Sequence, residues 1–145
     1  MSAERRFADR GKRLMPRSFR NFIHRKPLPL VHIRSTPRYL TRHGTPSTVA
    51  DLAARSLIGF DVPTEFLRNA SKTLLGWRRE AFAMRTDSDL AQLALIRSGA
   101  GISVCQVPVA RRDDAMVRVL PKQFSLPLET WISMHEACAA VHAAG

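Results

Sequence analysis

The sequence has few of the features that mark exported, membrane-bound or cross-linked proteins. Its two cysteines, Cys105 and Cys138, form no Cys-x-x-Cys pattern. Lone thiols are usually buried small apolar residues, which predicts a reducing compartment without a disulfide. No run of about 18 apolar residues is present, and the start lacks the apolar segment of a secretory signal. We therefore expect a cytoplasmic protein and no membrane partner. A mitochondrial transit peptide is the alternative for the Arg-rich start, although Glu4 and Asp9 interrupt it.

Patterns that carry catalysis or metal binding are also missing. None of the five histidines shares zinc-ligand spacing with another histidine or a cysteine. The chain contains no Gly-x-Ser-x-Gly nucleophile elbow. Residues 99–101, Gly-Ala-Gly, would close a helix and open a strand, which is the wrong order for a dinucleotide fingerprint and fits a helix C-cap. The sequence therefore predicts no enzyme, no metal site and no cofactor.

Positive charge is what the chain has in excess, and it is unevenly distributed. The formal net charge is +11, yet residues 1–43 hold 12 Lys+Arg against 2 acidic residues, and residues 44–145 hold 11 against 10. A basic arm with interleaved phenylalanines favours weak, sequence-independent nucleic-acid binding, and a solvated tail is the alternative. The residues that would contact phosphates are Arg5, Arg6, Arg10, Lys12 and Arg13.

Three regions differ in their patterning. Residues 1–36 show no sustained helical or alternating period, and prolines interrupt them, so we expect a basic, poorly ordered arm. Residues 37–137 alternate apolar runs of strand length with helical patterns, and residues 138–145 form a short tail. We expect strands near 56–61, 81–85, 102–106, 116–120 and 130–135, and helices near 49–55, 89–98 and 108–112. Strand, helix and strand with short joints predict an α/β fold with a mainly parallel sheet flanked by helices.

The best-formed unit begins at Thr86, Asp87 and Ser88, which are all N-cap residue types and follow a predicted strand. Ligands bind at the edge of an open parallel sheet where strands end and helices begin. Free backbone N–H groups and hydroxyls there could hold a small anion, although Asp87 would repel one at close range. Simple capping of the helix is the alternative.

Two stretches resemble a known family. Residues 86–137, TDSDLAQLALIRSGAGISVCQVPVARRDDAMVRVLPKQFSLPLETWISMHEA, look like the C-terminal half of the effector-binding domain of LysR-type bacterial transcriptional regulators. Residues 37–61, PRYLTRHGTPSTVADLAARSLIGFD, look like the same domain where it crosses into its second subdomain. The most specific segments are 38–40 with 43–46, 57–60 and 98–102, in the family's order.

The resemblance implies a type 2 periplasmic-binding-protein-like fold, with a small-molecule effector in a cleft between two α/β subdomains. Carried over by position, the expected effector-binding residues are Thr86, Asp87, Ser88, Val104, Cys105 and Gln106, with Phe60 and Asp61 as weaker candidates.

The departures from the family limit what the chain is expected to do. Residues 1–36 match neither the winged helix-turn-helix, nor the linker helix, nor the first half of the effector domain, so the chain looks like a truncated regulator. We therefore expect a ligand-sensing fragment that affects transcription only together with a DNA-binding head, and contacts DNA only indirectly. The alternatives are a homo-oligomer, a module that pairs with full-length LysR-type regulators, and weak nucleic-acid binding through the arm.

Overall fold

The computed structural model describes residues 21–25, 30–128 and 131–135. The chain divides into two compact units, one made of residues 1–28 and 129–145 and the other of residues 29–128. In the first unit, β1 (Asn21–Arg25) pairs antiparallel with β8 (Trp131–His135), so the strand expected at the C-terminal end is confirmed. Cys138 and the proposed phosphate-contacting side chains lie outside the described residues; the latter are Arg5, Arg6, Arg10, Lys12 and Arg13.

The second unit is built around β2 (Leu30–Ser35). This strand pairs antiparallel with β5 (Ser103–Gln106) along one edge, and with β6 (Val117–Arg118) and β7 (Leu126–Pro127) along the other. Strand β2 therefore lies between β5 on one edge and β6 and β7 on the other, and it runs antiparallel to all three.

A parallel pair continues the arrangement beyond β5. Strand β3 (Leu57–Gly59) runs parallel to β4 (Phe82–Arg85). Leu57 also forms a parallel bridge with Ile102, and the Ile58 and Ile102 amides donate to backbone carbonyls across this junction at 2.9 Å. Strand β3 therefore lies between β4 and the chain that enters β5, as expected for a β4–helix–β5 crossover.

The α/β class is confirmed, and two details of the prediction are wrong. The sheet is mixed rather than mainly parallel, because β2 runs antiparallel to its neighbours. Strand β2 also lies inside residues 1–36, which we expected to be poorly ordered. Its alternation, in which Val31 and Ile33 are separated by His32, is too short to form a sustained period.

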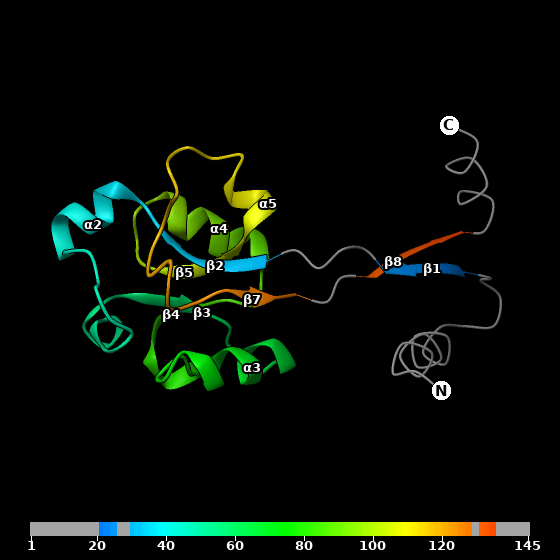
Figure 1. Ribbon diagram of the computed structural model, residues 1–145, viewed down its shortest axis with the longest axis horizontal. Coiled ribbons are helices and arrows are strands. Elements are labelled where there is room, and N and C mark those ends of the chain that lie inside the picture. The colour runs from blue at the N-terminus through cyan, green and yellow to red at the C-terminus, as the bar shows by residue number, and fades with distance from the viewer. Residues whose placement is uncertain (1–20, 26–29, 129–130, 136–145) are drawn as a thin grey trace. The chain divides into compact units, whose positions relative to one another are not determined.

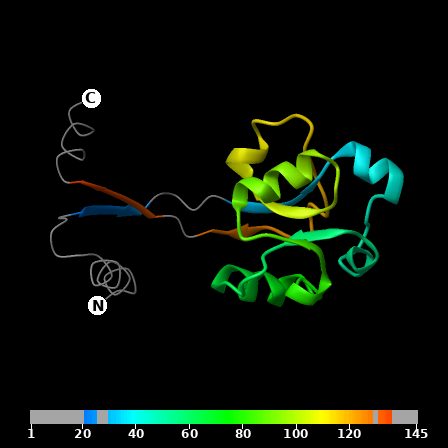
Figure 2. The ribbon, with the colours of Figure 1, turned by 180° about the vertical axis from the view of Figure 1, so that it is seen from behind.

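The helices of the described residues cover both faces of these strands. Helix α4 (Asp89–Arg97) and the short α5 (Val107–Ala110) lie on one side of β2, while α3 (Glu65–Thr73) lies on the other side of the unit (Figures 1 and 2). The remaining helical segments are α2 (Pro37–His43), η1 (Ala50–Ala54) and η2 (Arg79–Ala81).

Local signals explain where several helices begin and end. Thr48 and Asp51 exchange hydrogen bonds of 3.3 and 2.9 Å in a capping box, which opens a 3-10 turn where a helix near 49–55 was expected. At the end of α4, Gly99 has a φ of +75°, and the amides of Gly99 and Ala100 donate to Ile96 and Leu95. This is a Schellman motif, so Gly99 serves as the predicted helix stop.

Apolar packing on each face fixes the unit. On the α3 face, Ile33, Leu74 and Trp77 are almost completely buried, and the Trp77 ring meets Phe82 edge to face at 5.3 Å. On the α4 face, a smaller cluster joins Ile96 to residues of β3 and the loop before β6. The two clusters position the connections at the ends of β3, β4 and β5.

Protonation of His32 is expected to destabilise this unit. Burial, followed by the charges of Arg118, Arg34 and Arg111, lowers the pKa of His32 below its usual 6.5. The unfolded chain therefore takes up a proton that the folded chain resists, so the free energy of unfolding falls as the pH drops below about 6.5 and levels off below the folded pKa. Denaturant unfolding at about pH 7.5 and about pH 5.5 measures this loss. The same loss in a His32→Gln variant would contradict it.

Candidate functional site

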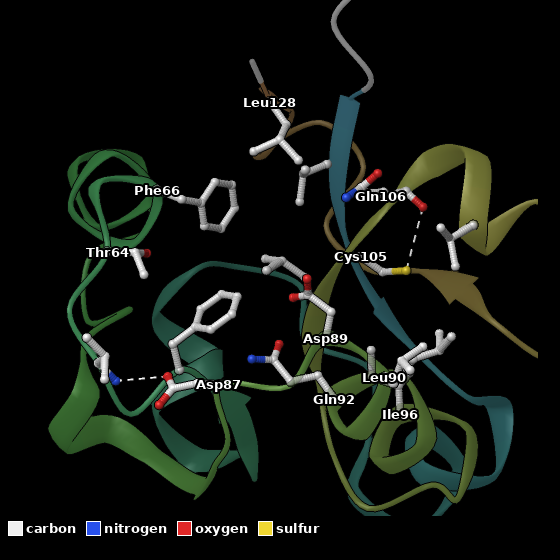
Figure 3. A pocket seen from close by; sticks show the side chains of 16 residues that line it. Thr64, Phe66, Asp87, Asp89, Leu90, Gln92, Ile96, Cys105, Gln106 and Leu128 are labelled. Atoms are coloured by element: carbon white, nitrogen blue, oxygen red, sulfur yellow. Dashed lines mark hydrogen bonds between the residues drawn. The ribbon is translucent and has the colours of Figure 1, made fainter. Parts of the chain in front are cut away.

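A cavity of about 510 Å³ opens in the second unit. It lies between the connection from β3 to α3 on one side and the start of α4 with the end of β5 on the other (Figure 3). Its apolar lining consists of Val31, Phe60, Val62, Phe66, Leu90, Leu93, Ile96, Val104, Val109 and Leu128. Its polar lining consists of Thr64, Asp87, Asp89, Gln92, Cys105 and Gln106.

Asp87 lines the cavity and also ties its two walls together. The Asp87 Oδ1 atom accepts hydrogen bonds from the backbone amides of Asp61 and Val62, both at 3.0 Å. These bonds hold the loop after β3 against the residue that precedes α4. The carboxylate therefore has a structural role in addition to its place in the lining.

Thr86 and Ser88 act locally. The Ser88 hydroxyl caps α4 by accepting from the Ala91 amide at 3.3 Å, and the Thr86 hydroxyl accepts from the Ser88 amide at 3.2 Å. Neither residue lines the cavity. The capping interpretation of Ser88, which the sequence left open, describes its contacts.

Phe60 and Asp61 both follow β3, but they have different roles. Phe60 lines the cavity and meets Phe66 edge to face, with ring centroids 6.4 Å apart. The Asp61 carboxylate lies outside the lining, where it pairs with Arg79 at 2.7 Å and with Arg85 at 3.7 Å. Asp61 therefore anchors the loop that carries Phe60.

Strand β5 supplies Val104, Cys105 and Gln106 to the lining, as expected. Cys105 is a free thiol whose sulfur contacts the Gln106 carbonyl oxygen at 3.6 Å. Burial, the largest influence, raises the pKa of this thiol above its usual 9.0. At neutral pH the group is therefore a neutral thiol, and it contributes a weakly polar surface rather than a nucleophile.

Gln92 is a polar lining residue that the sequence did not single out. It is 4% exposed, and its Nε2 donates to the Thr86 carbonyl at 2.9 Å. Asp89 and Gln92 both extend from α4 toward the cavity (Figure 3). Their positions in the first turn of a predicted helix at a strand end were the available signal.

The cavity thus gathers part of the predicted set. Phe60, Asp87, Val104, Cys105 and Gln106 line it, whereas Thr86, Ser88 and Asp61 do not. The wall formed by Val62, Thr64 and Phe66 was missed because the region from 64 to 75 has a weak apolar pattern, with only Leu67 and Ala70 buried on α3.

Within the described ranges, no group of three or more His, Cys, Asp and Glu side chains is placed to hold a metal ion. None of the helices described is long and apolar enough to cross a membrane.

Comparison with solved structures identifies the fold. The regulatory domain of CrgA, a LysR-type transcriptional regulator from Neisseria meningitidis, is similar with a TM-score of 0.61 at 17% identity, over 86% of this chain and 65% of that one. The regulatory domain of AphB from Vibrio vulnificus gives 0.61 at 15% identity, over 86% and 68%. ArgP from Mycobacterium tuberculosis gives 0.57 at 16% identity, over 85% and 44%.

These similarities rest on structure. No protein-family model and no curated protein matches the sequence. The chain spans about two thirds of the CrgA regulatory domain and 44% of full-length CrgA. The expected resemblance is confirmed at the level of the fold, which is that of LysR-type regulatory domains, with its type 2 periplasmic-binding-protein-like architecture.

Proposed function

We propose that this chain is a ligand-sensing module of LysR type, non-enzymatic, whose cavity binds a small-molecule effector. Binding of the effector would affect transcription in the cytoplasm through a partner that carries a DNA-binding head. The chain itself would form a homo-oligomer or pair with full-length regulators of the same type. The proposed effector-binding residues are Thr86, Asp87, Ser88, Val104, Cys105, Gln106, Phe60 and Asp61, with Thr86, Ser88 and Asp61 acting by holding the walls in place.

The observation that carries this proposal is the cavity itself. Its volume of about 510 Å³ falls in the range of small-molecule sites, and its lining is mainly apolar with a few polar groups. It also lies beyond the carboxyl ends of β3 and β4, where open sheets with parallel strands bind ligands. The lining residues that the structure describes all lie within residues 30–128.

Filling the cavity is expected to abolish ligand binding. Gln106 is exposed at the end of β5, so a Gln106→Trp change places a large ring at the cavity without altering the buried core. Amide chemical shifts of the full chain, followed during titration with benzylamine, benzoate and benzyl alcohol, report binding near α4 and β5. We expect the shifts caused by the compounds that bind to disappear in the variant.

The matched control is Gln123→Trp, which introduces the same ring at an exposed glutamine outside the lining. This control should bind as the unchanged chain does. Unaltered binding by Gln106→Trp, or shifts confined to residues away from the lining, would show that the cavity is not the ligand site.

A further inference from the structure

The charged side chains described in the cavity lining are negative, whereas the chain as a whole is positively charged. We propose that the cavity takes an amphipathic amine, meaning an apolar or aromatic body that carries one positively charged nitrogen. This inference rests on the proposed function, because it names the ligand class of the same cavity.

Among the described residues, two charged side chains line the cavity, and both are acidic. They are Asp87 and Asp89; the described part of the lining holds no lysine, arginine or histidine. The whole chain carries 23 Lys+Arg against 12 acidic residues, so an all-acidic lining is the opposite of its average composition. A carboxylate ligand would find no cationic side chain in this lining, and an ammonium group would find two carboxylates.

Neither carboxylate is neutralised by a neighbouring cation among the described residues. Asp87 uses Oδ1 for two backbone amides, which leaves Oδ2 as a further acceptor. Asp89 makes no ion pair in this part of the chain. Arg34, whose charge acts on Cys105, lies outside the lining, and three other arginines are paired with carboxylates. Arg79 and Arg85 contact Asp61, and Arg97 contacts Asp113.

Gln92 adds a hydrogen-bond acceptor to the same wall. Its amide nitrogen is directed to the Thr86 carbonyl, so the side-chain oxygen is the atom left to meet a ligand. That oxygen makes no hydrogen bond to another described residue, and it is not among the buried side-chain atoms without a partner, which belong to His32, Arg34 and Arg118. It is therefore an accessible acceptor, which suits a ligand that donates hydrogen bonds, as an ammonium group does.

The N-terminus of α4 is the feature that would favour an anion instead. A helix N-terminus is equivalent to roughly half a positive charge. Two full negative charges lie beside it, and the Ser88 side chain already accepts from the Ala91 amide. The acidic side chains therefore outweigh the helix terminus, and the site selects against carboxylates.

The remaining lining describes the body of the ligand. Phe60 and Phe66 meet edge to face and both line the cavity. Figure 3 shows the Phe66 ring facing the interior across from α4. Aromatic rings accommodate apolar groups and also attract cations through their faces.

Three compounds with one body test the inference: 4-phenylbutylamine, 4-phenylbutanoate and 4-phenylbutan-1-ol. Amide chemical shifts of the full chain at neutral pH give the three dissociation constants. We expect the amine to bind more tightly than the carboxylate by about tenfold or more, with the alcohol between them. Binding of the carboxylate as tightly as the amine would overturn the inference and leave the proposed function standing. Binding of none of the three would count against both.

Charge-removing variants separate the carboxylate from general packing. Asp89→Asn should weaken amine binding by about fivefold and leave alcohol binding unchanged. Asp87→Asn, which retains the Oδ1 acceptor, serves as a second variant. Asp114→Asn removes the same charge from an exposed residue outside the lining and should change neither affinity. Equal losses for amine and alcohol in Asp89→Asn, or no loss for the amine, would contradict the assignment.

Discussion

Replacing Trp77 by alanine is expected to lower the free energy of unfolding by about 3–5 kcal/mol. Trp77 is 2% exposed and packs edge to face against Phe82, at the start of β4. Truncation leaves a cavity that the surrounding residues fill only in part, and it removes the contact that holds β4 from the α3 side. Since domains of this size are stable by about 5–15 kcal/mol, the variant should lose a large fraction of its total stability.

Guanidinium unfolding followed by circular dichroism measures this loss, and a nearby leucine supplies the control. Leu75 is 80% exposed and lies two residues earlier in the chain. Leu75→Ala should change stability by less than about 0.5 kcal/mol, since it leaves no buried void. Similar midpoints for the two variants would mean that Trp77 is not part of an ordered core.

The elements that could be predicted from sequence are those with local signals. The capping box at Thr48 and Asp51 and the glycine after α4 use short-range hydrogen bonds and backbone conformation, which a few neighbouring residues determine. Helix α3 also has a local signal, since Thr64 caps it at 3.1 Å, but its buried residues are too few to show a period.

The direction of β2 could not be predicted for a different reason. Strand direction depends on which distant segments pair, and β2 meets β5, β6 and β7 across large separations in the chain. Its burial also departs from the alternation, because three consecutive residues are buried. His32 is buried with its Nε2 atom 3.2 Å from the Ser125 hydroxyl, so a polar residue occupies a position that local reasoning assigns to solvent.

The residues of the candidate site also divide into those that local sequence signals predict and those that only tertiary contacts bring into place. Asp87 was predicted because ligands bind where parallel strands end and helices begin. The β5 residues were predicted from the family resemblance. Both arguments depend on the order of the elements along the chain. The opposite wall depends on α3 and its N-terminal loop, and these come into place only through tertiary contacts such as the bonds from Asp61 and Val62 to Asp87. Asp87 and Asp89 both lie at the start of α4, whereas the described residues of the opposite wall add no charged side chain to the lining.

The junction between β3 and β5 should tolerate even one added methyl group poorly, so Gly101→Ala is expected to cost about 3 kcal/mol. A Cβ at Gly101 would lie 2.2 Å from the Ser56 carbonyl oxygen, which accepts from the Ile102 amide at 2.9 Å. That oxygen belongs to the backbone, so relief requires β3 and β5 to separate. Gly76→Ala is the matched control: its φ of +90° costs about 1 kcal/mol, and nothing lies within 4 Å of the new Cβ.

Guanidinium unfolding of the two glycine variants gives the difference directly. Equal losses would show that β3 and β5 separate at little cost.

The expected larger loss in Gly101→Ala also affects the cavity, because Phe60 follows β3 while Val104 and Gln106 lie on β5. A junction forced apart moves these walls relative to each other, so the folded fraction of Gly101→Ala should bind 4-phenylbutylamine more weakly than the folded fraction of Gly76→Ala. Equal affinities in the two variants would mean that the cavity walls are held by the Asp87 bonds alone.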